Sequence, residues 1–181
     1  GLEIVNKEEL KKFIPNISDD AILALHAKTS GIVCPYELTI ASIGNAMDNG
    51  AELFTNFEVC KISYNNEIFK VFSKTNNSVE GKIVINASGI NGGKISSLVN
   101  DNTISIKGRK GEYILVDREN SDFINKTLFL TPTKKGKGIL ITNTVDGNIL
   151  FGPTSKEIED NSTSTDSSSF DEIIPRTISL M

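Results

Sequence analysis

Ile83-Val84-Ile85-Asn86-Ala87-Ser88-Gly89 is the stretch that decides the fold. Its first three residues form a continuous apolar run, which is typical of a strand buried on both faces of a sheet. Ala87, Ser88 and Gly89 follow at once, so no large side chain blocks an approach to the end of that strand. Because ligands of open α/β sheets bind at the carboxyl ends of strands, we expect a binding site here.

The residues before this stretch predict a helix followed by a β-meander. Pro35 suits a helix start, and Gly50 suits the position after a helix end. The apolar residues between them recur at helical spacing, at Tyr36, Ile40, Ile43 and Met47. The small residues Ala41 and Gly44 leave room for close packing against a sheet. A meander of three short strands is then expected, with strands at residues 53–63 and around Phe69 and Val71 and turns at 65–66 and 76–78, and the buried strand at 83–85 follows the meander.

The two ends of the chain predict different structure. Asn6 and Glu9 form a capping-box pattern for a short helix that ends at Pro15, and residues 21–28 suit either a strand or a helix. A short helix is expected after Gly89, and antiparallel strands follow from residue 102 at 104–107, 112–116, 127–130, 138–144 and 148–151. Residues 155–169 are predicted as a polar loop, and a helix starts near Phe170. We therefore expect a mixed α/β (α+β) fold with two unequal lobes.

Composition sets the broad class. The 181 residues suffice for one domain or two small lobes with a buried core. The net charge of −4 argues against nucleic acid or an anionic membrane as a partner. No apolar run is long enough to span a bilayer, and no signal peptide opens the sequence, so we expect a cytoplasmic location.

Cysteine, histidine and glycine usage narrow the chemistry. Cys34 and Cys60 lack a C-x-x-C spacing, and we expect two unpaired thiols. His26 is the only histidine, which argues against a metal site. We expect it to be exposed or satisfied by neighbours and not to act as a catalytic base. No G-x-G-x-x-G occurs, so these residues cannot hold a dinucleotide pyrophosphate in the usual way.

Six segments, taken in order, resemble a known family: TSGIVCPYELT at 29–39, NGAELFTNFEV at 49–59, VINASG at 84–89, RKGEY at 109–113, KGILIT at 137–142 and GNILFGPT at 147–154. Together they resemble the FAD-dependent oxidoreductases of the D-amino-acid-oxidase superfamily. Within it, they are most similar to the branch of anaerobic glycerol-3-phosphate dehydrogenases and L-2-hydroxyglutarate oxidases.

The resemblance implies that this chain is the middle portion of such a flavoenzyme. In that family a glycine-rich loop lies upstream and an arginine-bearing segment lies downstream. Residues 1–31 would then be part of the substrate cap. Residues 32–100 would form a partial FAD-binding lobe with a β-meander. Residues 101–181 would again belong to the cap and would contain its antiparallel sheet and the start of a helix.

The resemblance also implies where FAD would be contacted. Val59 matches a position whose main chain meets the adenine, although it also fits an ordinary strand valine. Ala87, Ser88 and Gly89 match a turn that passes beside the flavin cofactor, where small residues permit a close approach. A plain strand-to-helix turn is the alternative.

Four residues are candidates for binding a small anionic substrate. Tyr113 matches a cap-strand position that faces substrate and flavin in relatives, and its hydroxyl can bond a carboxylate or a phosphate. Arg109 and Lys110 would add positive charge, and Thr154 would border the active site. The alternatives are a half-buried aromatic side chain for Tyr113, solvated cations at a strand end for Arg109 and Lys110, and a turn residue for Thr154. The lysines of 134–137 fit a solvated hairpin tip better than a phosphate clamp.

The chemistry implied by the family is hydride transfer from a hydroxy substrate to FAD. The resemblance allows three kinds of substrate: glycerol 3-phosphate, a 2-hydroxy acid or an amino acid. It does not identify the catalytic base or the electron-transfer partner, and it leaves open a peripheral membrane association of the full-length enzyme. We expect this chain alone to be inactive. The alternative is a non-catalytic module that binds a small molecule or a protein.

Overall fold

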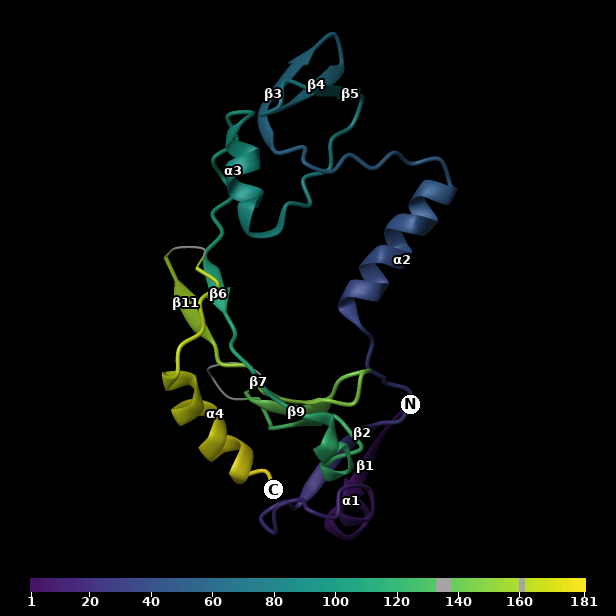
Figure 1. Ribbon diagram of the computed structural model, residues 1–181, viewed down its shortest axis with the longest axis vertical. Coiled ribbons are helices and arrows are strands. Elements are labelled where there is room, and N and C mark those ends of the chain that lie inside the picture. Colours follow the sequence, from purple (N-terminus) through teal and green to yellow (C-terminus); the bar gives the residue numbers. More distant parts are fainter. Residues whose placement is uncertain (133–137, 160–161) are drawn as a thin grey trace. The chain divides into compact units, whose positions relative to one another are not determined.

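The computed structural model describes residues 1–132, 138–159 and 162–181, drawn as a ribbon in Figure 1. The chain divides into two compact units. Unit 1 comprises Gly1–Ile40, Arg109–Glu157 and Ser162–Met181, and unit 2 comprises Ala41–Gly108 and Ile158–Asn161. The mixed α/β class with antiparallel sheets confirms the predicted fold class.

Unit 1 begins with a hairpin that encloses a capped helix. Strands β1 (Leu2–Asn6) and β2 (Leu23–Ala27) pair antiparallel, and α1 (Lys7–Phe13) lies between them in sequence. The predicted capping box is confirmed, because Asn6 Oδ1 accepts from the Glu9 amide at 3.0 Å and Glu9 Oε2 accepts from the Asn6 amide at 3.2 Å. The strand alternative for residues 21–28 is the correct one.

The second part of unit 1 is a four-stranded antiparallel sheet in the order β7-β10-β9-β8. Its central pair aligns Ile149 with Asn143 and Phe151 with Ile141. The elements that complete this part are β7 (Ile114–Val116), the 3₁₀ helix η2 (Arg118–Phe123), β8 (Leu128–Phe129), β9 (Leu140–Asn143), β10 (Ile149–Gly152) and α4 (Ser168–Ile178). Helix α4 continues through Pro175.

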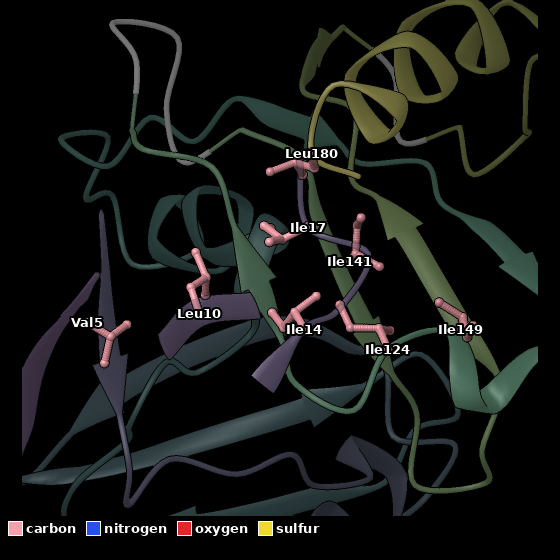
Figure 2. Close-up of a cluster of buried hydrophobic side chains, with 8 residues drawn as sticks. All are labelled: Val5, Leu10, Ile14, Ile17, Ile124, Ile141, Ile149 and Leu180. Atoms are coloured by element: carbon pink, nitrogen blue, oxygen red, sulfur yellow. The ribbon is translucent and has the colours of Figure 1, made fainter. Parts of the chain in front are cut away.

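The core of unit 1 gathers side chains from both ends of the sequence. Ile141 and Ile149 of the sheet lie in one cluster with residues of the N-terminal hairpin and helix, and Leu180 joins them from the end of the chain (Figure 2). The members are Val5, Leu10, Ile14, Ile17, Ile124, Ile141, Ile149 and Leu180. This shared core holds the hairpin, the sheet and the C-terminal segment together as one body.

Unit 2 contains the predicted meander. Strands β3 (Val59–Asn65), β4 (Ile68–Ser73) and β5 (Ser78–Gly81) form an antiparallel sheet in that order. The first turn lies one residue later than predicted, because Asn66 and Glu67 take the positive φ values of 50° and 64°. The 3₁₀ helix η1 (Gly89–Asn91) and α3 (Gly92–Ser97) follow, as expected of the segment after Gly89.

Three elements have residues in both units. Helix α2 (Pro35–Asp48) follows the predicted helix closely, and Gly50 after it has φ of 90°. Strands β6 (Gly108–Lys110) and β11 (Lys156–Ile158) form a separate two-stranded sheet. None of the described helices has the length and apolar character that a membrane crossing requires.

The prediction of a buried strand at 83–85 is wrong. No described strand pairs with these residues, and Ile83 and Ile85 are 81% and 85% exposed. An apolar run becomes a strand only where a neighbouring strand takes its backbone hydrogen bonds. The expected packing of α2 through Ala41 and Gly44 is likewise not found, because no residue of α2 is buried.

Other strand boundaries also differ from the expectations. The strand expected at 53–63 begins only at Val59, after Asn56 takes φ of 56°. Residues 104–107 are not a strand, β7, β8 and β9 are shorter than predicted, and β10 lies one residue later than predicted. Part of the loop expected at 155–169 is β11, while the lysine-rich turn at 134–137 lies outside the described residues.

Candidate functional site

The candidate cofactor residues lie in unit 2, where one asparagine side chain organises the turn after residue 85. Asn86 Nδ2 donates to the Gly92 carbonyl at 2.9 Å and to Ser96 Oγ at 3.3 Å. Its Oδ1 accepts from the Ser88 hydroxyl at 2.6 Å and from the Ser88 amide at 3.4 Å. Asn86 therefore fastens the turn to α3. The sequence predicted this turn but not the part played by Asn86.

Ala87, Ser88 and Gly89 are exposed, and their side chains are small. Gly89 has φ of 57°, a left-handed conformation that favours glycine, and nothing lies within 4 Å of a Cβ built on it. These features fit a turn whose backbone is open to a large planar ligand such as a flavin.

Val59, the fourth candidate, is half-buried at the start of β3, opposite Ser73. The pairing register shifts between Val59 and Lys61, as in a β-bulge. A bulge frees backbone groups from the sheet ladder, which fits a main-chain contact with a ligand.

The candidate substrate residues lie in unit 1, where Tyr113 precedes β7 and is 48% exposed. Gly152 lies against it. A Cβ added to Gly152 would come within 3.0 Å of Tyr113 Cδ1 and 2.9 Å of the Glu112 carbonyl oxygen. Only a glycine permits this approach without displacing the backbone around Tyr113.

Thr154 is 2% exposed and joins the same backbone from the other side. Its amide donates to the Glu112 carbonyl at 3.0 Å, and its Oγ1 accepts from the Glu112 amide at 3.0 Å. Thr154 thus holds both backbone polar groups of Glu112. Its burial favours a structural part in the site over direct contact with substrate.

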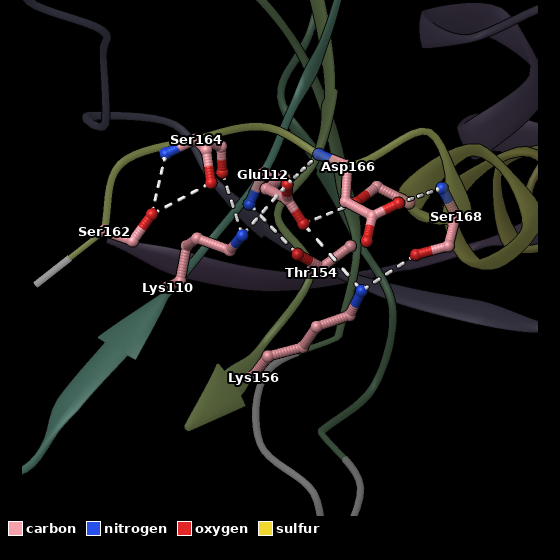
Figure 3. Close-up of polar contacts among 9 residues, drawn as sticks. Lys110, Glu112, Thr154, Lys156, Ser162, Ser164, Asp166 and Ser168 are labelled. Atoms are coloured by element: carbon pink, nitrogen blue, oxygen red, sulfur yellow. Dashed lines mark hydrogen bonds and ion pairs between the residues drawn. The ribbon is translucent and has the colours of Figure 1, made fainter. Parts of the chain in front are cut away.

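The Glu112 carboxylate lies at the centre of a polar cluster (Figure 3). Glu112 is only 5% exposed, and Oε1 accepts from the Asp166 amide at 2.7 Å while Oε2 accepts from the Ser169 hydroxyl at 2.5 Å. Lys110 Nζ lies 3.3 Å from Oε1 and Lys156 Nζ lies 3.9 Å from Oε2. The Ser169 hydrogen bond, helped by the Asp166 amide and Lys110, holds the pKa of Glu112 below its usual value.

The two candidate cations have different surroundings. Lys110 is bound within the cluster, because it also donates to the Ser164 carbonyl at 2.9 Å. Arg109 is exposed, and no described residue makes an ion pair or a hydrogen bond with its guanidinium. Adjacent residues of a strand point to opposite faces, which explains why Lys110 enters the cluster and Arg109 does not.

His26 lies elsewhere in unit 1 and has a partner. Its Nδ1 lies 3.1 Å from Glu3 Oε1, and its ring lies against Phe13 with centroids 4.9 Å apart. This agrees with the prediction of a satisfied histidine. Both cysteines are free, as predicted, with Cys60 exposed and Cys34 partly so.

Comparison with known proteins adds independent information. The family model described as FAD dependent oxidoreductase matches residues 1–181. A glycerol 3-phosphate dehydrogenase of Caloramator mitchellensis is 37% identical over 159 residues, which cover 88% of this chain and 33% of that protein. A glycerol 3-phosphate oxidase of Mycoplasma genitalium is 28% identical over 167 residues, which cover 90% of this chain and 44% of that protein.

Solved structures share the fold. An L-alpha-glycerophosphate oxidase of Mycoplasma pneumoniae, solved with FAD bound, superposes with a TM-score of 0.88 at 23% identity, covering 99% of this chain and 48% of the other. A glycerol-3-phosphate dehydrogenase of Bacillus halodurans complexed with FAD gives 0.70 at 15% identity, covering 98% and 37%. This chain thus spans less than half the length of these relatives. The match along its whole length shows that the chain belongs to the FAD dependent oxidoreductase family.

Proposed function

We propose that this chain is the middle portion of a flavoenzyme that oxidises glycerol 3-phosphate. The 37% identity to a glycerol 3-phosphate dehydrogenase over 88% of the chain is the observation that carries this proposal. The exposed Arg109 and the half-exposed Tyr113 of unit 1 support an anionic substrate.

Arg109 and Tyr113 are the residues that we propose for substrate binding. A guanidinium can donate two parallel hydrogen bonds to a phosphate, and the Tyr113 hydroxyl can donate a third. Lys110 is already neutralised by Glu112, so we assign it to the support of the site. Thr154 supports the backbone before Tyr113 and does not touch substrate in this proposal.

Val59 and the turn Ala87-Ser88-Gly89 are the residues that we propose to contact FAD. When bound, FAD supplies the acceptor for the hydride that leaves the carbon bearing the substrate hydroxyl. The exposed turn offers backbone groups and no bulky side chain to that cofactor. A pyrophosphate fingerprint is not among these 181 residues, so we expect this chain alone neither to retain FAD tightly nor to oxidise substrate.

The test compares the 181-residue chain with the full-length protein. We expect a flavin absorbance spectrum after desalting only from the full-length protein, and bleaching of that spectrum by glycerol 3-phosphate. Bleaching by a 2-hydroxy acid or an amino acid alone would contradict the substrate, and a colourless full-length protein would contradict the cofactor. A flavin spectrum from the short chain would contradict its predicted inability to retain FAD.

Arg109→Ala tests the binding site within the full-length enzyme. Losing charge-assisted hydrogen bonds to phosphate should raise KM for glycerol 3-phosphate by roughly 10- to 100-fold. Arg118→Ala is the matched control, because Arg118 is also an exposed arginine of unit 1 but lies in η2. Equal KM values for the two variants would remove Arg109 from the substrate site.

A further inference from the structure

The buried carboxylate of Glu112 has no role in the substrate binding proposed above. Glu112 is more deeply buried than any other acidic residue that the structure describes, and it sits next to Tyr113 in sequence. Burial of a charged group is costly unless partners replace its water, so the partners of Glu112 decide what this carboxylate does.

The partners of the Glu112 side chain come from distant parts of the sequence. Its two oxygens bond the Asp166 amide and the Ser169 hydroxyl, which lie 54 and 57 residues away. The Asp166 side chain in turn accepts from the Ser168 amide at 2.8 Å. One carboxylate thereby fixes the start of α4 to the segment that carries Tyr113.

The charges around Glu112 are balanced within the cluster. Lys110 and Lys156 face its two oxygens, and the Asp166 carboxylate faces the same two lysines. Lys156 also donates to Ser168 Oγ at 3.3 Å. Two cations and two anions therefore share one site, which stabilises Glu112 as a carboxylate without an external ligand.

The backbone of Glu112 carries the connection to Tyr113. Both its amide and its carbonyl are bonded to Thr154, so the peptide that precedes Tyr113 has a fixed orientation. The Tyr113 ring itself is half-exposed and lies against Gly152. Its direction therefore depends on this backbone more than on packing around the ring.

We propose that Glu112 is a positioning residue for Tyr113: its charged side chain fastens the start of α4, its backbone pairs with Thr154, and together these contacts aim the tyrosine hydroxyl at the substrate. This inference rests on the proposed function, in which Tyr113 binds substrate. Glutamine cannot replace the carboxylate fully, because its NH₂ group would have to face one of the donors or cations that now face an oxygen.

The first experiment tests the positioning in the 181-residue chain without any activity. The chain has three tyrosines, so 3-fluorotyrosine labelling gives three ¹⁹F resonances that single Tyr→Phe variants assign. Glu112→Gln should shift or broaden the Tyr113 resonance and leave those of Tyr36 and Tyr64 in place. Glu80→Gln is the control, because it breaks a 2.8 Å ion pair with Lys70 in unit 2.

The second experiment measures kinetics in the full-length enzyme. Glu112→Gln and Tyr113→Phe should each raise KM for glycerol 3-phosphate by about fivefold, the effect of one misplaced hydrogen bond, with kcat nearly unchanged. The KM of the double variant should not exceed the higher of the two single-variant KM values, because both changes act through one hydroxyl. Thr154→Val should behave like Glu112→Gln, and Thr154→Ser, which keeps the acceptor oxygen, should restore the wild-type KM.

The outcomes separate this inference from the proposed function. An unchanged Tyr113 resonance in Glu112→Gln, or fully additive effects on KM, would overturn the positioning role even in an active enzyme. An enzyme inactive on glycerol 3-phosphate would overturn the proposed function, and the ¹⁹F spectra would still decide whether Glu112 fixes Tyr113. A shifted resonance with normal KM in both single variants would remove Tyr113 from substrate binding and with it the positioning role.

Discussion

Unit 1 and unit 2 differ in whether they bury apolar side chains. Every hydrophobic residue that is buried in the described chain belongs to unit 1: Val5, Leu10, Ile14, Ile17, Ile124, Ile139, Ile141, Ile149, Ile173 and Leu180. Both units expose some large apolar side chains, but in unit 2 no described hydrophobic residue is buried, and Ile83, Ile85 and Phe54 are all exposed. A sequence pattern thus reports that an element has an apolar face, but not that the same chain covers it.

Helix α2 illustrates the difference. Its apolar residues recur at the spacing of a helix that packs on a sheet, yet Ile43 and Met47, in the part of α2 that belongs to unit 2, are 37% and 49% exposed. We propose that the part of the FAD-binding lobe outside these 181 residues covers such faces in the full-length enzyme, because the relatives are more than twice as long as this chain.

The largest expected effect comes from deleting a core side chain of unit 1. Ile141→Ala should lower the free energy of unfolding by about 2–5 kcal/mol, because Ile141 is fully buried in the cluster. Ile85→Ala in unit 2 should change it little in this chain and considerably more in the full-length protein. Urea unfolding followed by circular dichroism measures both. Equal losses in the 181-residue chain would contradict the contrast between the units.

Glycines of the two units should respond with opposite signs. Gly152→Ala should destabilise by about 1–3 kcal/mol, because φ is 137° and a Cβ would meet the Glu112 carbonyl oxygen at 2.9 Å. Gly44→Ala lies within α2, has nothing within 4 Å of its Cβ, and should stabilise by about 0.5–1 kcal/mol. The same unfolding curves decide this, and a destabilising Gly44→Ala would indicate a packed helix face.

The smallest expected effect is on the free energy of unfolding at acid pH. The pKa of Glu112 is held below the ordinary value of a glutamate, chiefly by the Ser169 hydrogen bond, so its contribution to stability is complete above that ordinary value and is lost as pH falls through the lowered one. Glu112→Gln should remove that loss, and the two unfolding midpoints should converge toward low pH. Asp101→Asn in unit 2 should show a weaker version, since only Thr103 lowers the pKa of Asp101. A constant gap between wild type and Glu112→Gln would contradict this ionisation.

Local signals were sufficient for part of the fold. The capping box of Asn6 and Glu9, the end of α2 before Gly50 and the turn at Asn76 all depend on a few neighbouring residues, and the structure contains each. The error at 83–85 has a different origin, because a strand needs a pairing partner that no local pattern supplies. The sheet partner β11 was missed for the same reason.

The candidate site divides in the same way. Arg109, Tyr113 and the turn at Ala87 stand out by residue type and by resemblance to a family. Glu112 and Asn86 do not, because their importance comes from partners such as Ser169 and Ser96, which only the folded chain brings near. The Glu112 carboxylate and the Asn86 amide thus organise the segments that carry Tyr113 and the turn at Ala87.

The core that joins Val5 to Leu180 has a consequence for synthesis. On the ribosome, the local meander β3-β4-β5 can form as soon as its residues emerge, whereas the apolar side of the hairpin that encloses α1 is covered only after Ile124, Ile141 and Leu180 have emerged. Its apolar residues, Leu10 and Ile14 among them, stay uncovered during that interval. Chains truncated before Ile124 should therefore aggregate through the segment that carries Leu10 and Ile14, because the residues that cover it are made later.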